Sequence, residues 1–328
     1  MIFISGTRDI RMENTAVAVG KFDGLHLGHQ LLIDQINSYQ KNGMLSVMFT
    51  FDYSPASLLK GQKPVLIYTS QERRLIAQRL GIDVLIEYPF NQETAHMEAS
   101  DFVQDVLIGH LGARHIVVGE DFRFGNQAKG DAKLLLGMSM PLGYSAHICA
   151  KRCTVLTEDL LSYHAGEEVE ISSTLIRDAI SKGAMESANR MLGIPYRIIG
   201  EVLHGREIGH KMGMPTANLE TDSAKLLPPN GVYASEVIVD RRKYPAVTNI
   251  GNNPTVAVNQ EKRIETCIHG FDGNLYGRQL EVELYHFLRP EIKFPNLDAL
   301  HNQIQKDQEN ALAYIERMEK EDSAGGKL

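Results

Sequence analysis

The spacing of hydrophobic positions changes near the middle of this chain. From Thr15 to Glu186, short apolar runs alternate with segments in which apolar residues recur at helical spacing. The pattern predicts strands at 16–19, 46–51, 84–87, 115–118 and 145–148, and helices at 30–39, 70–80, 100–111 and 131–136. Such alternation is typical of a parallel sheet with helices on both faces. Ligands of that architecture bind at the carboxyl ends of the strands.

The second half of the chain has the pattern of consecutive strands. Strands are predicted at 197–203, 231–239, 242–250, 264–271 and 275–287, and Asp272-Gly273-Asn274 signals a hairpin between the last two. Strands without helices between them indicate an antiparallel barrel or sandwich. A final helix is expected to pack on it through an apolar stripe formed by Leu297, Leu300, Ile304, Ala311, Ile315 and Met318. We expect 322–328 to be disordered.

Length and composition indicate two domains, with a boundary near 187–194. The 328 residues suffice for domains at 1–186 and 187–328, and 43% hydrophobic with 23% charged residues is typical of a soluble globular protein. A net charge of −7 without a basic cluster argues against nucleic-acid binding. No apolar stretch has the length of a membrane span or a signal peptide. Three cysteines without a C-x-x-C pair indicate free thiols and a cytoplasmic protein, and a weak homo-oligomer is left open.

The most informative segment is Gly20-Lys21-Phe22-Asp23-Gly24-Leu25-His26-Leu27-Gly28-His29. It lies between a predicted buried strand and a predicted helix, so its backbone N–H groups and the positive helix end would face a phosphate. His26 and His29 would add side-chain donors. Alternatively, the glycines serve only the turn, or the histidines bind a metal, although no third ligand lies nearby in the sequence. The spacing fits neither the P-loop nor the dinucleotide-binding motif.

Two further segments of the first half carry candidate chemistry. Phe122 and Phe124 follow a predicted buried strand, and as exposed aromatics beside an arginine they would stack on a flat ring; alternatively they pack the domain. Ser172-Ser173-Thr174 precedes a helix with Arg177 one turn on. These residues either cap the helix or bind the β- and γ-phosphates of ATP.

The second half contains a glycine-spaced segment that ends in Pro215-Thr216-Ala217-Asn218. Glycines at 205, 209 and 213 would let the backbone approach phosphates closely, or would form only a mobile loop. Thr216 and Asn218 present oxygen groups suited to Mg²⁺. Further on, Glu265 is a single carboxylate among apolar neighbours of a predicted strand, a position that is most often salt-bridged or at a rim.

These motifs resemble those of a known family. G-x-F-D-G-x-H-x-G-H at 20–29 and S-S-T-x-x-R at 172–177 are similar to the signatures of nucleotidyltransferases, and P-T-A-N at 215–218 with N-I-G-x-x-P-T at 249–255 is similar to riboflavin kinases. Together they resemble the bacterial bifunctional riboflavin kinase/FAD synthetases. The resemblance implies an α/β Rossmann-like nucleotidyltransferase domain with a parallel sheet, then an antiparallel β-barrel kinase domain with a terminal helix. It also implies two reactions: riboflavin and ATP give FMN, and FMN and ATP give FAD and pyrophosphate.

The resemblance also implies roles for individual residues. It makes Glu265 the base of the kinase and gives His26, His29 and Arg177 catalytic roles in adenylyl transfer. ATP and its phosphates would be bound by Gly20, Phe22, Asp23, Gly24, Gly28, Ser172, Ser173 and Thr174 in the first half, and by Gly205, Gly209, Gly213 and Pro215 in the second. Flavin would be bound by Asp121, Phe122, Phe124, Asn249 and Arg289. Mg²⁺ would be bound by Thr216 and Asn218.

The chain departs from the family pattern at two positions. Ser54 stands where many members have a histidine, and Leu175 stands where many have an arginine. Both changes remove a cationic contact, so one alternative is a kinase whose transferase half is weakened. A second alternative is a flavin-binding regulator without turnover, against which Glu265, Thr216 and Asn218 argue. A third, an adenylyltransferase for another phosphorylated vitamin, would leave the second half unexplained.

Overall fold

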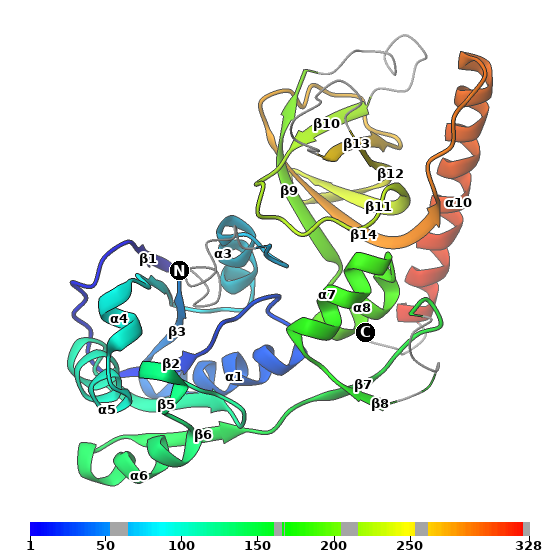
Figure 1. Cartoon of the computed structure of the whole chain (residues 1–328). Helices are drawn as coiled ribbons and strands as arrows, with labels where there is room; N and C mark the ends of the chain where they lie inside the picture. Colours follow the sequence, from blue (N-terminus) through cyan, green and yellow to red (C-terminus); the bar gives the residue numbers. More distant parts are fainter. Residues whose placement is uncertain (53–64, 161–165, 167, 205–215, 253–261, 324–328) are drawn as a thin grey trace. The chain divides into compact units, whose positions relative to one another are not determined.

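The computed structural model describes residues 1–52, 65–160, 166, 168–204, 216–252 and 262–323 (Figure 1). Contacts along the chain divide it into two compact units. Unit 1 comprises Met1–Leu66, Arg73–Cys153 and Glu170–Ser172, and unit 2 comprises Ile67–Glu72, Thr154–Val169 and Ser173–Leu328. The domain boundary between residues 186 and 187 stays a prediction.

Unit 1 contains a parallel six-stranded sheet, as predicted, with the order β1-β4-β3-β2-β5-β6. The strands are β1 (Ile2–Ser5), β2 (Thr15–Val19), β3 (Leu45–Phe51), β4 (Val84–Tyr88), β5 (Ala113–Gly119) and β6 (Ser145–Cys149). The helical elements are α1 (Leu27–Asn37), η1 (Gln40–Asn42), α3 (Ser70–Arg79, which begins in unit 2), α4 (Gln92–His96), α5 (Ala99–Asp101), η2 (Phe102–His110), η3 (Asn126–Ala128) and α6 (Ala132–Leu142). The sequence pattern missed β1, whose side chains are exposed or half-buried at the sheet edge.

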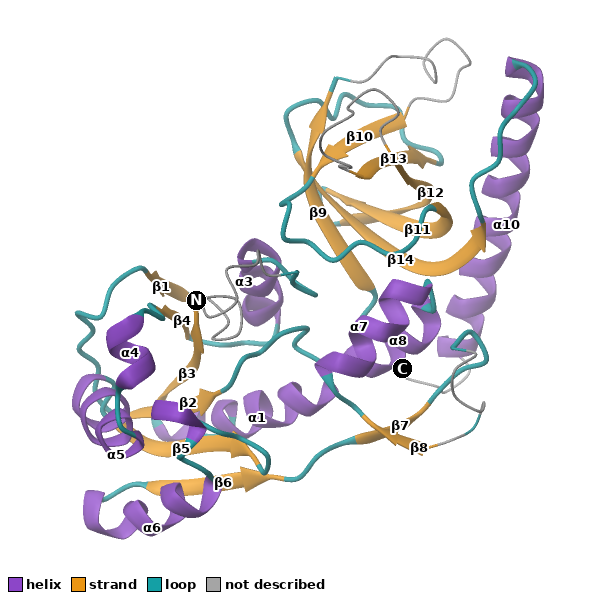
Figure 2. Cartoon of the chain, in the orientation of Figure 1, coloured by secondary structure: helices purple, strands orange, loops and turns teal. Residues whose placement is uncertain are grey.

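Both faces of this sheet are covered (Figure 2). Val17 and Val19 point into a core that includes Phe102 and Val106 of η2, whereas α1 packs across β2, β3 and β5. A strand buried on both faces reads as a continuous apolar run, and all five residues of β2 are buried. The chain moves from β2 to β3 and β4 on one side, then returns to β5 on the other. The loop after β2 therefore lies at a topological switch point, where such sheets bind ligands.

The helix predicted over 100–111 has a different form in the structure. Only α5 is α-helical, and η2 is a π-helix of nine residues. Its wider turn brings the backbone N–H of Leu111 within 3.1 Å of the Val106 carbonyl. A side chain at Gly109 would meet the Gln104 carbonyl at 3.2 Å, so glycine suits this position. Hydrophobic spacing alone does not distinguish a π-helix from an α-helix.

Unit 2 contains a closed antiparallel barrel with the order β10-β13-β12-β11-β14-β9. The strands are β9 (Tyr196–Leu203), β10 (Thr216–Glu220), β11 (Gly231–Val239), β12 (Arg242–Asn252), β13 (Lys262–Ile268) and β14 (Gln279–Arg289). The hairpin predicted at 272–274 is wrong, because β13 pairs with β10 and β12 while β14 pairs with β9 and β11. The tight hairpin lies between β11 and β12, where Asp240 and Arg241 both have positive φ.

Helices complete unit 2. They are α7 (Ser173–Lys182), α8 (Met185–Leu192) and α10 (Leu297–Ser323). A separate two-stranded sheet, formed by β7 (Cys153–Val155) and β8 (Glu168–Glu170), has residues in both units. α10 lies along β11 and β12, as Figure 1 shows, and Ala311 packs with Val232, Ala234 and Val247. The expected disorder from residue 322 is wrong for 322 and 323, which are helical; 324–328 lie outside the described residues. No described helix is long and apolar enough to cross a membrane.

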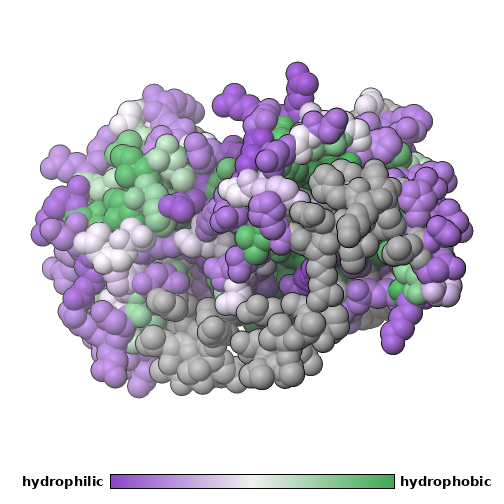
Figure 3. Space-filling view, turned by 90° about the horizontal axis from the view of Figure 1, so that it is seen from above, coloured by the Kyte–Doolittle hydropathy of each residue, from purple (hydrophilic) through white to green (hydrophobic). Residues whose placement is uncertain are grey.

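Large apolar side chains are exposed at only a few described positions, among them Ile2, Leu136 and Met140. On the face seen in Figure 3, hydrophilic residues surround the hydrophobic ones.

Candidate functional site

The loop after β2 is held in an unusual backbone conformation. Phe22, Gly24 and Leu25 all have positive φ, at 46°, 92° and 43°. Left-handed backbone is strained for Phe22 and Leu25, and both side chains are fully buried, which offsets that strain. Packing thus fixes a loop that hydrophobic spacing could not predict in this detail.

His26 and His29 meet at the start of α1, as the sequence predicted. His26 is the N-cap: its Nδ1 accepts a hydrogen bond from the backbone N–H of His29 at 3.4 Å. The two rings stack with centroids 3.7 Å apart, and the Phe22 ring lies 5.2 Å from that of His29. Gly28 leaves the room this stack needs, because a Cβ there would lie 3.2 Å from the His26 ring.

Both imidazoles are neutral at pH 7. Burial lowers the pKa of His26 to about 4, against the opposing effect of Asp121. Burial also lowers the pKa of His29 well below its ordinary value, and the neighbouring His26 and Arg73 lower it further. The buried Nδ1 of His29 has no hydrogen-bond partner among the described residues. A buried polar atom without a partner is costly, so this atom is available to a ligand.

The residues of the second signature lie where a helix begins. Ser172 precedes α7, which starts at Ser173, so Thr174 and Arg177 fall on its first turns. Leu175 is only 8% exposed, and its position is therefore part of the hydrophobic packing. That these residues act together with His26 and His29 stays a prediction, and Ser54 lies outside the described residues.

The aromatic pair after β5 differs in part from expectation. Phe124 is not exposed: at 7% exposure it packs in the core against Phe102, with ring centroids 5.8 Å apart. Phe122 is half-buried and stacks on Phe124 with centroids 5.4 Å apart. Asp121 beside them is exposed and lies 3.7 Å from the Lys151 ammonium. Of the three flavin-binding residues predicted in this segment, Asp121 and Phe122 are thus accessible to a ligand and Phe124 is not.

In unit 2, strand register brings the predicted kinase residues into one row across the barrel. Asn218 of β10 lies opposite Glu265 of β13, and Glu265 lies opposite Asn249 of β12. Asn249 in turn pairs with Val232 of β11, and Val232 pairs with Arg289 of β14. Residues paired across neighbouring strands share a face of the sheet. Four predicted residues from distant parts of the sequence therefore lie on one side of the barrel wall.

That side faces α10 rather than the barrel interior. The Gln308 amide of α10 donates to Cys267 Sγ at 3.2 Å, and Cys267 lies two residues from Glu265 on the same face. The opposite face carries Ser235, Thr248 and Thr266, which are fully buried and hydrogen-bonded in a chain inside the barrel. The predicted residues are thus positioned on the outer wall, under the terminal helix.

A cavity of about 150 Å³ lies between this wall and α10. Glu265, Asn249 and Arg289 line it, as do Thr216 and the apolar side chains Val232, Val247, Ile292, Phe294, Leu300 and Ile304. The Glu265 carboxylate lies 3.2 Å from the Arg263 guanidinium, and both side chains are about one-third exposed. The cavity thus combines apolar side chains with polar ones, and the Glu265 carboxylate is among them.

The sequence interpretation missed Asp307, which also lines the cavity. Its carboxylate accepts hydrogen bonds from Arg289 Nε at 2.9 Å and from the terminal guanidinium nitrogen at 2.6 Å, and Gln303 donates to it at 2.8 Å. Asp307 is only 2% exposed, although it lies on a helix whose neighbouring residues Lys306 and Gln308 are polar. The sequence did contain a signal for Asp307, because a charged residue there lies on the apolar side of the predicted amphipathic helix.

Thr216 and Asn218 fit the metal site predicted for them. The buried Oδ1 of Asn218 accepts no hydrogen bond from any described residue, so an oxygen is free for a cation beside Glu265. The structure also changes the interpretation of this segment, since both residues lie on β10, the strand that closes the barrel. Gly205, Gly209, Gly213 and Pro215 lie outside the described residues.

A second cavity of about 390 Å³ adjoins the first at Thr216. Its walls come from Val202, Ala217, Ile268 and the loop 271–276. Tyr276 of that loop stacks on His204 with ring centroids 3.8 Å apart. Thr216 therefore lines two cavities of the same unit.

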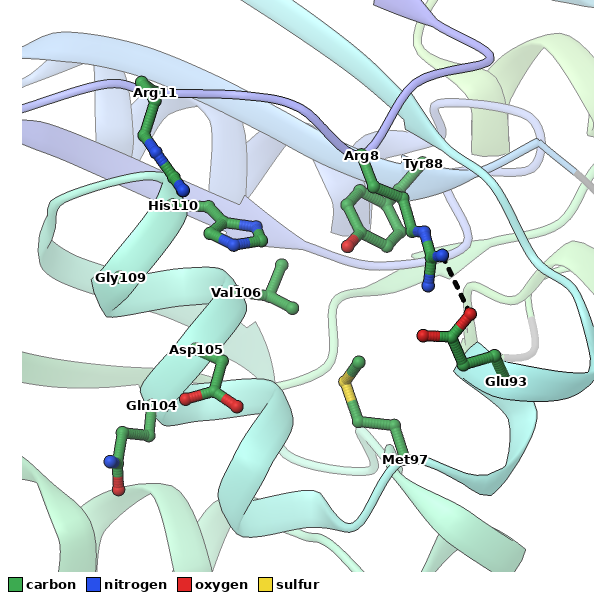
Figure 4. A pocket seen from close by; sticks show the side chains of 10 residues that line it. All are labelled: Arg8, Arg11, Tyr88, Glu93, Met97, Gln104, Asp105, Val106, Gly109 and His110. Carbon is green, nitrogen blue, oxygen red and sulfur yellow. Dashed lines mark ion pairs between the residues drawn. The ribbon is translucent and has the colours of Figure 1, made fainter.

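A wider cavity of about 770 Å³ lies in unit 1, away from all predicted site residues (Figure 4). Its walls are formed by Arg8 and Arg11, by Tyr88 and Glu93, and by η2 from Gln104 to His110. Arg8 and Glu93 form an ion pair of 2.8 Å at its edge, in which the Arg8 side chain is 37% exposed and that of Glu93 68%. Among the described residues, none from the segments 20–29 and 172–177 lines this cavity.

Comparisons with known proteins agree with this layout. The family model described as FAD synthetase matches residues 9–158, and the one described as Riboflavin kinase matches residues 192–315. A protein of Buchnera aphidicola named bifunctional riboflavin kinase/FMN adenylyltransferase is 33% identical to this chain, over 96% of this chain and 99% of the relative. A protein of the same name from Escherichia coli is also 33% identical, over 92% of this chain and 93% of the relative.

A solved structure, described as a macrolide-efflux protein from Streptococcus pneumoniae, is similar over 94% of this chain and 98% of its own, with a TM-score of 0.80 and 31% identity. The description applies to that protein alone. The similarity shows that nearly the whole chain has the fold of that structure. The two family models match in the order in which the two signatures occur. This chain belongs to the family of bifunctional riboflavin kinase/FMN adenylyltransferases.

Proposed function

We propose that the chain catalyses both steps of FAD synthesis: riboflavin and ATP give FMN, and FMN and ATP then give FAD and pyrophosphate. The proposal assigns the transferase to 1–186 and the kinase to 187–328. The observation that carries it is the row of Asn218, Glu265, Asn249 and Arg289 beside a cavity, because these residues match a kinase pattern and share one face only through strand register. Family membership supplies the identity of the flavin.

In the kinase step, Glu265 accepts the proton of the ribityl 5′-hydroxyl while that oxygen attacks the γ-phosphate of ATP, the bond from the γ-phosphorus to the β-phosphate oxygen breaks, and ADP leaves. The flavin ring occupies the cavity under α10, with Asn249 and Arg289 as polar contacts, and the nucleotide occupies the cavity of Tyr276. Thr216 lines both cavities, so phosphoryl transfer takes place beside it. Thr216 and Asn218 would hold Mg²⁺, which offsets the charge of the phosphates.

In the transferase step, a phosphate oxygen of FMN attacks the α-phosphate of ATP and pyrophosphate leaves. The attacking oxygen is already anionic, so the protein does not have to remove a proton from it. The protein has to align this oxygen with the α-phosphate of ATP and to stabilise the charge of the departing pyrophosphate. His26 and His29 donate as neutral imidazoles to phosphate oxygens, together with the loop formed by Gly20, Phe22, Asp23, Gly24 and Gly28. Ser172, Ser173, Thr174 and Arg177 bind the departing pyrophosphate. Asp121 and Phe122 contact the flavin, and Phe124 supports Phe122 from the core.

Chromatography of the products tests this function. The purified chain is incubated with riboflavin, ATP and Mg²⁺, and we expect FMN to form first and FAD to follow. FMN without FAD would contradict the second step and would direct attention to Ser54 and Leu175. Flavin binding without formation of FMN or FAD would support the alternative that the chain is a flavin-binding regulator without turnover.

The magnesium assignment makes a prediction for Asn218→Ala. The kinase step is expected to need at least about tenfold more Mg²⁺ for half-maximal rate, because one oxygen ligand is lost. The Mg²⁺ dependence of FAD formation from supplied FMN should stay the same. The measurement is a Mg²⁺ titration of each step, with the exposed strand residue Glu220→Gln as the control. An equal shift in both steps would contradict a kinase-specific site.

The contacts of Asp307 make a second prediction. In Asp307→Asn, the Arg289 guanidinium loses its charged partner, so the KM for riboflavin is expected to rise about tenfold with a smaller change in kcat. The free energy of unfolding should fall by about 2 kcal/mol, because a hydrogen-bonded buried ion pair is broken. Steady-state kinetics and urea unfolding measure the two effects. Asp298→Asn, on the exposed first turn of α10, should change neither.

A further inference from the structure

A buried arginine of unit 1 lies outside both segments that resemble nucleotidyltransferase signatures. Arg73 is on the first turn of α3, and its side chain is only 6% exposed. Its Nη1 donates a hydrogen bond to the Glu87 carboxylate of β4 at 2.8 Å. Its Nε is buried and has no hydrogen-bond partner among the residues that the structure describes. Because buried polar atoms are almost always paired, this donor is available to a group from outside the described residues.

Strand register places the partner of Arg73 next to the loop after β2. Phe49 of β3 and Ile86 of β4 point into the core on the η2 side of the sheet, so the residues that follow them face the α1 side. These residues are Thr50 and Glu87, which are paired in register. The Thr50 hydroxyl donates to the Lys21 carbonyl of the loop at 3.1 Å. Glu87 therefore lies one strand away from the loop, on the face where α1 packs.

The charge of Arg73 also acts on His29 at the start of α1. Burial is the main cause of the lowered pKa of His29, and His26 and Arg73 lower that pKa further. The buried Nδ1 of His29, like the Nε of Arg73, has no hydrogen-bond partner in the described part of the chain. Both nitrogens can donate a hydrogen bond. Two buried donors near one loop indicate a ligand with more than one acceptor oxygen, as a phosphate has.

The start of α3 fixes the position of Arg73. Glu72 Oε2 accepts a hydrogen bond from the backbone N–H of Thr69 at 2.9 Å, and the Thr69 hydroxyl accepts one from the backbone N–H of Glu72 at 3.3 Å. The buried Lys225 ammonium donates to the same Glu72 oxygen at 2.8 Å. The Glu72 carboxylate is thus engaged by the helix end and by Lys225, and Arg73 pairs with Glu87. An arginine held in this way is preorganised for a ligand.

We propose that Arg73 is a further substrate-binding residue of the transferase site and that its guanidinium binds a phosphate oxygen near His29. The inference rests on the proposed adenylyl transfer to FMN. A guanidinium presents its N–H groups as a planar fork, and its Nη1 lies on the side away from the Nε–H. One side therefore holds Glu87 while Nε donates to a phosphate. Both ATP and FMN carry phosphate oxygens, and separate kinetic measurements distinguish these two sources.

Kinetics of both steps in the full chain test this role. For FAD formation from FMN and ATP, kcat/KM should fall about 10²-fold in Arg73→Gln, and about tenfold in Arg73→Lys, which keeps the charge but lacks the fork. FMN formation from riboflavin should keep its rate in both variants. With each substrate varied in turn, a higher KM for ATP alone assigns the phosphate to the nucleotide, and a higher KM for FMN alone assigns it to the flavin. Arg74→Gln, which removes the exposed next residue of α3, should change neither step.

Glu87→Gln separates phosphate binding from a merely structural ion pair. It keeps the guanidinium, so kcat/KM for FAD formation should fall less than in Arg73→Gln. The double variant of Arg73→Gln and Glu87→Gln leaves no unpaired buried charge, so it should fold and still show the full loss. Equal losses in the two single variants, or an unaltered rate in the folded double variant, would overturn this inference alone. An unaltered chain that forms no FAD would instead contradict the proposed transferase function, and the role of Arg73 with it.

Discussion

Glu265→Gln should abolish most FMN formation while leaving FAD formation from supplied FMN intact. Glutamine has nearly the same shape as glutamate, so the row with Asn218 and Asn249 is kept, but its amide cannot accept the proton of the attacking hydroxyl. Loss of a general base lowers kcat by about 10²- to 10⁴-fold. The measurement is the initial rate of each step, followed by chromatography with riboflavin or with FMN as the flavin substrate.

Glu220→Gln is the matched control for this experiment. Glu220 is an exposed carboxylate on the same barrel, at the end of β10, and its change should leave both rates unaltered. If Glu265→Gln lowered both activities in a folded protein, the assignment of separate sites would be wrong. A kinase rate that survived unchanged would remove Glu265 from the role of base.

His29→Ala should have the opposite pattern, with FAD formation lost and FMN formation kept. The expected decrease in the rate of adenylyl transfer is about 10²- to 10³-fold, the effect of removing one donor that stabilises transition-state charge. The variant should fold, because the cap of α1 uses the backbone N–H of His29, which alanine retains. The rate of FAD formation from FMN and ATP is the measurement, with FMN formation from riboflavin as the internal reference.

The control is His96→Ala, which removes an exposed imidazole from the same unit. It should change neither step. Unchanged FAD formation in His29→Ala would contradict a phosphate-binding role for the unpartnered Nδ1 of His29.

Local patterns in the sequence predicted the fold class and the positions of most elements. Residues 16–19 of β2 form an apolar run because both faces of a parallel sheet are covered, and a short window of the sequence contains this signal. The same holds for the loop predicted to bind phosphate, since its glycines and the two histidines lie within ten residues. Elements with weak local signals were missed, such as β1 at a sheet edge and β10 with its polar residues.

The sequence by itself determined which residue types were available and which lay next to one another along the chain. Only the tertiary structure decided that Glu265 faces Asn218 and Asn249 and that Asp307 holds Arg289. Each of these contacts depends on strand register or helix docking between segments far apart in the sequence. A shift of one residue in register would turn Glu265 into the barrel interior. The free energy that selects the register comes from burial of the whole barrel and its helix, and no local window contains it.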